Sequence, residues 1–226
     1  MKIQDDLTSK LNKIIIESIK TGEKLPTEKE MTERLNVSRS VLRDALSVYE
    51  ASGVIVSKQG SGRFAQMPNI GSQIINIWSI FINEDPGLLL ELHQIRSILE
   101  IYSLPEAIHK ISFEQLQELN YHVSEMKRKV SLGQSFEDND REFHRILFAS
   151  THNGLLEQLM SAFWDLSTQA KLYTYREDLY LQANQHQDIL DAIVRKDTNL
   201  AVELMKQQTE DAKYQIITTL MNSPAE

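Results

Sequence analysis

The sequence predicts a mainly α-helical chain of two domains, with a small β-hairpin in the first domain and an all-α bundle in the second. The 226 residues contain only 8 glycines and 5 prolines, and such a composition favours helices. Apolar residues recur every three or four positions through most of the chain, as they do on the buried face of a helix. A chain of this length is large enough for two domains with separate hydrophobic cores.

Composition excludes several classes of protein. The longest apolar stretch, residues 74–82, is far shorter than the ~20 residues of a membrane-spanning helix. The N-terminus lacks the apolar run of a secretory signal, and the absence of cysteine removes disulfides, thiolate catalysis and cysteine-ligated zinc. We therefore expect a cytoplasmic protein with no membrane partner.

Charge differs between the two parts of the chain. Residues 1–68 hold 11 Lys and Arg against 9 Asp and Glu, a net charge of +2, whereas residues 69–226 hold 13 against 23, a net charge of −10. Glycine and proline are concentrated around residues 59–87, which indicates a change of domain. We expect domains at 1–68 and 86–226 joined by a linker at 69–85, with nucleic-acid binding in the more basic first domain.

Three helices are predicted in the first domain. The apolar face of the first helix consists of Leu7, Leu11, Ile15 and Ile19. Thr27 and Glu30 form a capping box that starts a second helix, which ends by Asn36. Ser38 caps a third helix, and Gly53 ends it. Because only residues 36–38 separate the second and third helices, the two are expected to cross steeply in a helix-turn-helix.

A short hairpin is predicted after the third helix. Residues 54–56 and 63–65 are apolar or β-prone and flank a glycine-containing tip at 58–62, which is typical of a wing. Three helices of this kind also occur in ordinary helical cores, and the wing is the feature that favours DNA binding.

In a helix-turn-helix the second helix of the pair presents its N-terminal residues to the major groove. Those residues here are Arg39, Ser40 and Arg43. No acidic residue stands one helical turn away, at positions 35, 36, 40 or 47. We therefore expect the two arginines to be available for phosphates or guanine edges.

The second domain is expected to be a helical bundle. Its predicted helices cover 88–110, a segment capped by Ser112 and Gln115, and then 136–150, 154–173, 176–196 and 197–221. No strand pattern intrudes, and the apolar spacing is helical throughout. A bundle of this size can enclose a pocket.

One candidate site is evident in the bundle. Asp140 and His144 are four residues apart and so share a helical face, and His186 lies on a later helix. Oxygen and imidazole ligands on facing helices suit zinc, manganese or nickel. An Asp and a His at this spacing more often form a local surface pair, so both interpretations stay open.

Four segments of the first domain, residues 25–30, 35–46, 53–55 and 60–64, closely resemble the winged helix of the GntR superfamily of bacterial transcription regulators. The resemblance covers most of residues 5–65. It implies a DNA-binding surface that we assign to Lys29, Ser38, Arg39, Ser40 and Arg43, with Gly60 and Gly62 in a wing that enters the minor groove. Lys29 stands where the family usually has arginine. A lysine ammonium group is a compact charge and cannot donate the paired hydrogen bonds of a planar guanidinium.

Residues 90–100, 140–144 and 186–193 resemble the C-terminal effector domain of the FadR branch of the same superfamily. The resemblance implies that Arg96 lines an effector pocket, where a guanidinium would pair with an organic-acid carboxylate. The alternative role of Arg96 is an ion pair with Glu100, four residues further on.

In metal-binding members of that branch, an Asp and three His surround a divalent ion. Asp140, His144 and His186 match three of these positions, and Gln208 stands where the family has the fourth His. A neutral amide is a poor zinc ligand, so the metal would bind weakly, use water or an effector carboxylate as a further ligand, or be absent. With Arg96, these four residues are the expected effector contacts. The other histidines are expected to be surface or core residues: His93, His109, His122 and His152.

Together these features predict a homodimeric bacterial transcription regulator, a repressor, that binds a palindromic double-stranded operator and senses a small organic acid. Two recognition helices related by symmetry would contact half-sites about one helical turn apart. One alternative is a metal-dependent enzyme that uses Asp140, His144 and His186, but it leaves the winged helix unexplained. The other is a winged-helix module that binds a partner protein.

Overall fold

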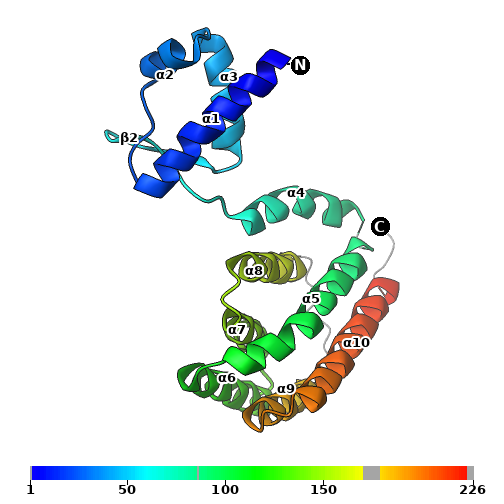
Figure 1. Ribbon diagram of the computed structural model, residues 1–226. Helices are drawn as coiled ribbons and strands as arrows, with labels where there is room; N and C mark the ends of the chain where they lie inside the picture. Colours follow the sequence, from blue (N-terminus) through cyan, green and yellow to red (C-terminus); the bar gives the residue numbers. More distant parts are fainter. Residues whose placement is uncertain (1, 86, 170–178, 223–226) are drawn as a thin grey trace. The chain divides into compact units, whose positions relative to one another are not determined.

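The computed structural model describes residues 2–85, 87–169 and 179–222 of the chain (Figure 1). It divides into two compact units, Met1–Asn69 and Ile70–Glu226. The described residues contain ten helices and one two-stranded antiparallel sheet, which confirms the mainly helical fold class. No described helix combines the length and the apolarity needed to cross a membrane.

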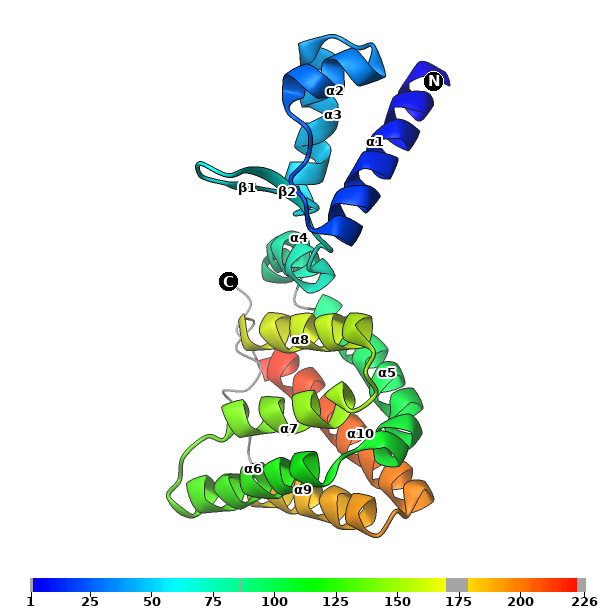
Figure 2. The same cartoon turned by 60° about the vertical axis from the view of Figure 1, so that its left-hand side comes forward.

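The first unit is a winged helix-turn-helix. It consists of α1 (Lys2–Thr21), α2 (Glu28–Leu35), α3 (Arg39–Ala51), β1 (Ile55–Lys58) and β2 (Gly62–Ala65). Each helix contributes fully buried side chains to one core, among them Leu11, Met31 and Leu42. Figure 2 shows the β-hairpin projecting from the three helices as a wing.

Local signals set the ends of these helices. Thr27 Oγ1 accepts a hydrogen bond from the Glu30 main-chain nitrogen at 3.3 Å, and the Glu30 carboxylate accepts one from the Thr27 main-chain nitrogen at 2.7 Å, so the capping box is present. Asn36 adopts the left-handed conformation with φ 53°. Ser38 then caps α3 through the Val41 main-chain nitrogen.

The wing is a regular hairpin. Ile55 pairs with Ala65 and Lys58 with Gly62. Gly62, with φ +110°, adopts a conformation that strains any residue with a side chain. Strand β2 is tied to the loop after α1, because the Leu25 main-chain nitrogen donates to the Arg63 carbonyl oxygen at 2.8 Å.

The second unit is an all-α bundle. Its helices are α4 (Ile70–Glu84), α5 (Leu88–Lys110), α6 (Phe113–Ser131), α7 (Glu137–Ala149), α8 (Gly154–Gln169), α9 (Leu179–Val194) and α10 (Thr198–Asn222). Helices α5 and α10 lie side by side (Figure 1), and α7 lies between α6 and α8 (Figure 2). The core includes the fully buried Phe136, Phe143 and Phe148. The predicted helix ends at residues 173 and 176 lie outside the described residues.

The segment at 69–85, expected as a linker, instead contains helix α4. This helix packs along α8, and its side chains Ile74, Trp78 and Ile82 join the core of the second unit. The four-residue spacing of these apolar side chains is the helical signal. Gly71 and the neighbouring prolines indicated a break instead, so the expected linker was too long.

Candidate functional site

The side chains assigned to DNA contact lie on the surface of the first unit. Lys29 is on α2, and Ser38, Arg39, Ser40 and Arg43 are at the start of α3; all five are exposed. The hydroxyl oxygens of Ser38 and Ser40 are 3.1 Å apart. Gly60 and Gly62 are exposed at the end of the hairpin. The N-terminal end of α3 therefore presents two exposed cations, Arg39 and Arg43, beside the hydroxyl groups of Ser38 and Ser40.

Arg43 has an acidic partner, contrary to the sequence-based expectation. Its Nε donates to Oε2 of Glu28 at 2.9 Å, and the other oxygen of Glu28 accepts from Nη1 of Arg63 at 2.9 Å. Glu28 is 15 residues from Arg43, so helical spacing could not reveal the pair. Hydrogen bonds from Arg63 and then Arg43 hold the pKa of Glu28 below its usual range.

The second unit contains a partly open cavity of about 70 Å³. Allowing ~10–15 Å³ for each water, this space is large enough for several waters or a small organic acid. The five residues predicted to contact an effector all line it: Arg96, Asp140, His144, His186 and Gln208. The other described lining residues are His93, Glu100, Trp164, Ser167, Gln182, Gln185, Thr209, Asp211, Ala212, Gln215 and Ile216.

Asp140, His144 and His186 form a compact cluster at this cavity. Their ligand atoms all lie within 4.8 Å of one another. Asp140 Oδ1 is 2.7 Å from His186 Nε2 and 3.6 Å from His144 Nε2. Each residue is at most 5% exposed, which excludes the interpretation as a surface pair.

Hydrogen bonding orients His186 toward this cluster. Its Nδ1 is 2.7 Å from the main-chain oxygen of Gln182. Because a carbonyl oxygen only accepts, Nδ1 carries hydrogen, and Nε2 is the nitrogen that faces Asp140. Metal-ligating histidines are commonly held in this way. The Gln208 carboxamide nitrogen is placed 3.2 Å from His186 Nε2, so the residue at the fourth position also contacts the cluster. A carboxylate, two imidazoles and a nearby carboxamide fit a divalent metal ion.

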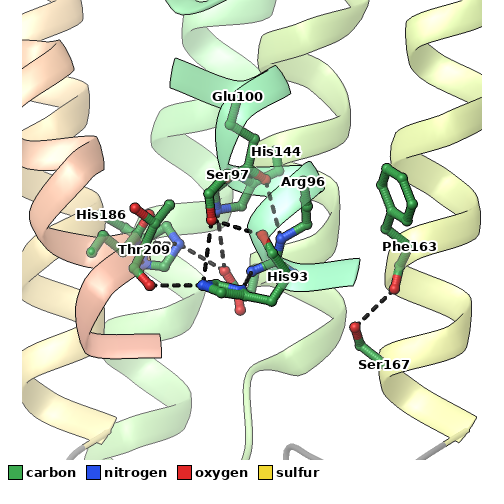
Figure 3. Close-up of polar contacts among 11 residues, drawn as sticks. His93, Arg96, Ser97, Glu100, His144, Phe163, Ser167, His186 and Thr209 are labelled. Atoms are coloured by element: carbon green, nitrogen blue, oxygen red, sulfur yellow. Dashed lines mark hydrogen bonds and ion pairs between the residues drawn. The ribbon is translucent and has the colours of Figure 1, made fainter. Parts of the chain in front are cut away.

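His93, expected to be an ordinary surface or core residue, lines the cavity. Its Nε2 donates to the main-chain oxygen of Thr209 at 2.8 Å, and its Nδ1 lies 3.3 Å from Nη2 of Arg96 (Figure 3). Burial, with a smaller contribution from the Arg96 charge, lowers the pKa of His93 to about 4. His93 and Glu100 are seven residues apart on α5, with Arg96 between them. This polar stripe on one helical face is the signal that could have revealed His93.

Arg96 lines the cavity and also lies near Glu100. Its Nε is 3.6 Å from Oε1 of Glu100, and its guanidinium lies 4.7 Å from the ring centroid of Trp164 at the cavity. Glu100 Oε1 is also 3.5 Å from His144 Nδ1. Burial raises the pKa of Glu100 to about 7, against the opposing effect of Arg96. Glu100 was expected only as an ion-pair partner of Arg96, and Trp164 was not expected at the cavity.

Two family models match the chain. Residues 4–64 match the bacterial regulatory proteins of the gntR family, and residues 91–211 match the FCD domain. The chain belongs to the GntR family. Its FCD domain corresponds to the FadR-type effector domain that the sequence predicted. This GntR-family chain is therefore a DNA-binding transcription regulator and not an enzyme.

Individual relatives agree with this assignment. The Uxu operon transcriptional regulator of Escherichia coli (strain K12) is 29% identical, over 87% of this chain and 79% of the relative. An uncharacterized HTH-type transcriptional regulator of Bacillus subtilis (strain 168), YcbG, is 33% identical, over 79% of this chain and 74% of the relative. The solved structure of Streptococcus agalactiae GntR shares the fold, with a TM-score of 0.62 at 22% identity over 94% of this chain and 99% of that one.

Proposed function

We propose that this GntR-family regulator binds a small carboxylate in the cavity of the second unit and that binding changes its affinity for operator DNA. The observation that carries the proposal is the position of Arg96, a buried guanidinium that lines the cavity and lies over Trp164. A guanidinium recognises a carboxylate through charge-assisted hydrogen bonds, which are strong where water is excluded.

The rest of the cavity favours an acid that also carries hydroxyl groups. Four glutamines line it: Gln182, Gln185, Gln208 and Gln215. Each carboxamide can both donate and accept a hydrogen bond, as a hydroxyl group can. Such a lining suits a hydroxy acid or a sugar acid better than an unsubstituted acyl chain, because hydroxyl groups can form hydrogen bonds with these amides and apolar carbons cannot.

We also propose a divalent metal, zinc, manganese or nickel, held by Asp140, His144 and His186. The burial of these side chains and the orientation of His186 support it. The ion would supply a Lewis acid that binds oxygen atoms of the effector. Gln208 stands beside the cluster as a weak fourth donor.

For the DNA interface, we propose that α3 enters the major groove, with contacts from Lys29, Ser38, Arg39, Ser40 and Arg43. Gly60 and Gly62 would bring the wing to the minor groove. A homodimer would place two copies of α3 on a palindromic operator, and effector binding would release the DNA, as in a repressor. Large exposed apolar side chains on α4, Ile77, Ile80 and Phe81, support a dimer because such patches mark interfaces.

The effector proposal is tested by thermal unfolding of the full chain with D-gluconate and hexanoate, two six-carbon acids that differ in their hydroxyl groups. Binding to the native state raises the melting temperature. We expect a larger increase with gluconate, its loss in R96Q, and its retention in R128Q, which alters an exposed arginine on α6. A chelator should reduce the increase if the metal assists. An equal increase for R96Q and the wild type would contradict the role of Arg96.

A further inference from the structure

Glu28 connects three elements of the DNA-binding unit. It is the first residue of α2, and its two carboxylate oxygens accept from Arg43 of α3 and Arg63 of β2, both at 2.9 Å. Arg63 also donates through Nε to Glu50 at 2.8 Å. Arg63 therefore has two acidic partners, whereas Glu28 is the carboxylate that contacts Arg43.

The contact with Glu28 uses one edge of the Arg43 guanidinium. Glu28 takes the Nε hydrogen, and the Arg43 side chain stays 66% exposed while that of Glu28 is only 23% exposed. The terminal Nη edge is the one that donates to O6 and N7 of a guanine in the major groove. An arginine already held in one orientation loses less conformational freedom when it binds.

We propose that Glu28 is a positioning residue that holds Arg43 for contact with a base and so increases discrimination between DNA sequences. The inference rests on the proposed role of Arg43 in DNA contact. A carboxylate close to DNA repels phosphates and weakens binding to every sequence alike. An aligned Arg43 strengthens binding only where a guanine accepts from it. Glu28 therefore raises the ratio of specific to non-specific affinity without raising affinity in general.

The test compares E28Q with E50Q in the full chain. Each variant removes one negative charge and one partner of Arg63, but only E28Q releases Arg43. The probes are a duplex enriched by the wild-type chain from a random-sequence pool and a shuffled duplex of the same composition. We expect E28Q to lower the affinity ratio by about tenfold, the scale of one good base contact. Its affinity for the shuffled duplex should be unchanged or higher, and E50Q should keep the wild-type ratio.

A double-mutant cycle separates positioning from a general structural effect. If Glu28 acts through Arg43, E28Q changes the ratio no further in an R43A background. A fall in the ratio in both backgrounds, or an E28Q ratio equal to that of E50Q or the wild type, overturns the inference. If the wild-type chain enriches no sequence from the pool, the proposed operator contacts fail, and the inference fails with them.

Discussion

His93 is buried at the cavity as a neutral imidazole, and this makes the stability of the second unit depend on pH. Burial and then Arg96 lower its pKa from 6.5 to about 4; Lys213 of α10 acts in the same direction, whereas Glu210 and the hydrogen bond to Thr209 oppose them. Between these pH values the unfolded chain binds the proton more tightly than the folded chain does. The contribution of the neutral His93 to the stability of the folded second unit is therefore complete above about pH 6.5, and it is lost as the pH falls toward 4.

Replacing this histidine should therefore reduce the acid sensitivity of the second unit. We expect H93Q to lose less free energy of unfolding between pH 7.5 and pH 4.5 than the wild type, by up to about 3 kcal/mol. Urea titrations followed by tryptophan fluorescence measure this, because Trp78 and Trp164, the only 2 tryptophans, both belong to the second unit. H109Q, at an exposed histidine of α5, is the control. Equal losses in H93Q and the wild type would show that His93 does not contribute.

Gln208 is the residue that distinguishes the proposed metal site from one with three histidines. An imidazole nitrogen binds zinc more strongly than a carboxamide does, so we expect Q208H to raise zinc affinity by about tenfold or more. Competition with a chromophoric chelator measures the change. Q215H, a histidine introduced elsewhere on the cavity wall of α10, should have little effect. Unchanged zinc affinity in Q208H would argue against Gln208 as a neighbour of the ion.

At the residue scale, spacing rules predicted local interactions, and the residues matched by the resemblance to the FadR branch line one cavity. The contacts of Thr27 with Glu30 span three residues, and a spacing rule predicts them. The pair of Glu28 and Arg43 joins two helices, and no periodicity reports such a contact. His93 was missed because a lone histidine carries no signal until the helix face that it shares with Arg96 is considered.

At the scale of elements, helix α4 gives the clearest difference between expectation and structure. Ile82 is 4% exposed and belongs to the core of the second unit, whereas Ile80 on the same helix is 64% exposed. We expect I82A to lower the free energy of unfolding of the second unit by about 2–4 kcal/mol. I80A should change it by less than about 0.5 kcal/mol.

Tryptophan fluorescence in urea again provides the measurement. If residues 69–85 behaved as the linker first expected, I82A and I80A would unfold at the same urea concentration.

The predicted helix at 88–110 coincides with α5, because the helical pattern of apolar residues continues over the whole segment. The segment before it was misjudged because glycine and proline signals compete there with a shorter apolar pattern.

At the scale of the whole molecule, the fold class and the two-part organisation followed from periodicity, composition and charge. The cavity did not follow from the chain's own periodicity, because its lining comes from α5, α7, α8, α9 and α10. Ligand chemistry suggested that Asp140 and His144 could meet His186 from a later helix, and the resemblance to the FadR branch added Arg96 and Gln208.

The central claim is that the cavity and the DNA surface are coupled, and a ligand couples them only if it favours one conformation. The most direct measurement is the Kd of the wild-type chain for its enriched duplex, by fluorescence anisotropy, with and without a saturating acid that raises the melting temperature. We predict at least about a fivefold weakening by the acid. R96Q should bind the duplex as the wild type does and show no change with acid. A wild-type Kd that the saturating acid leaves unchanged would contradict the claim.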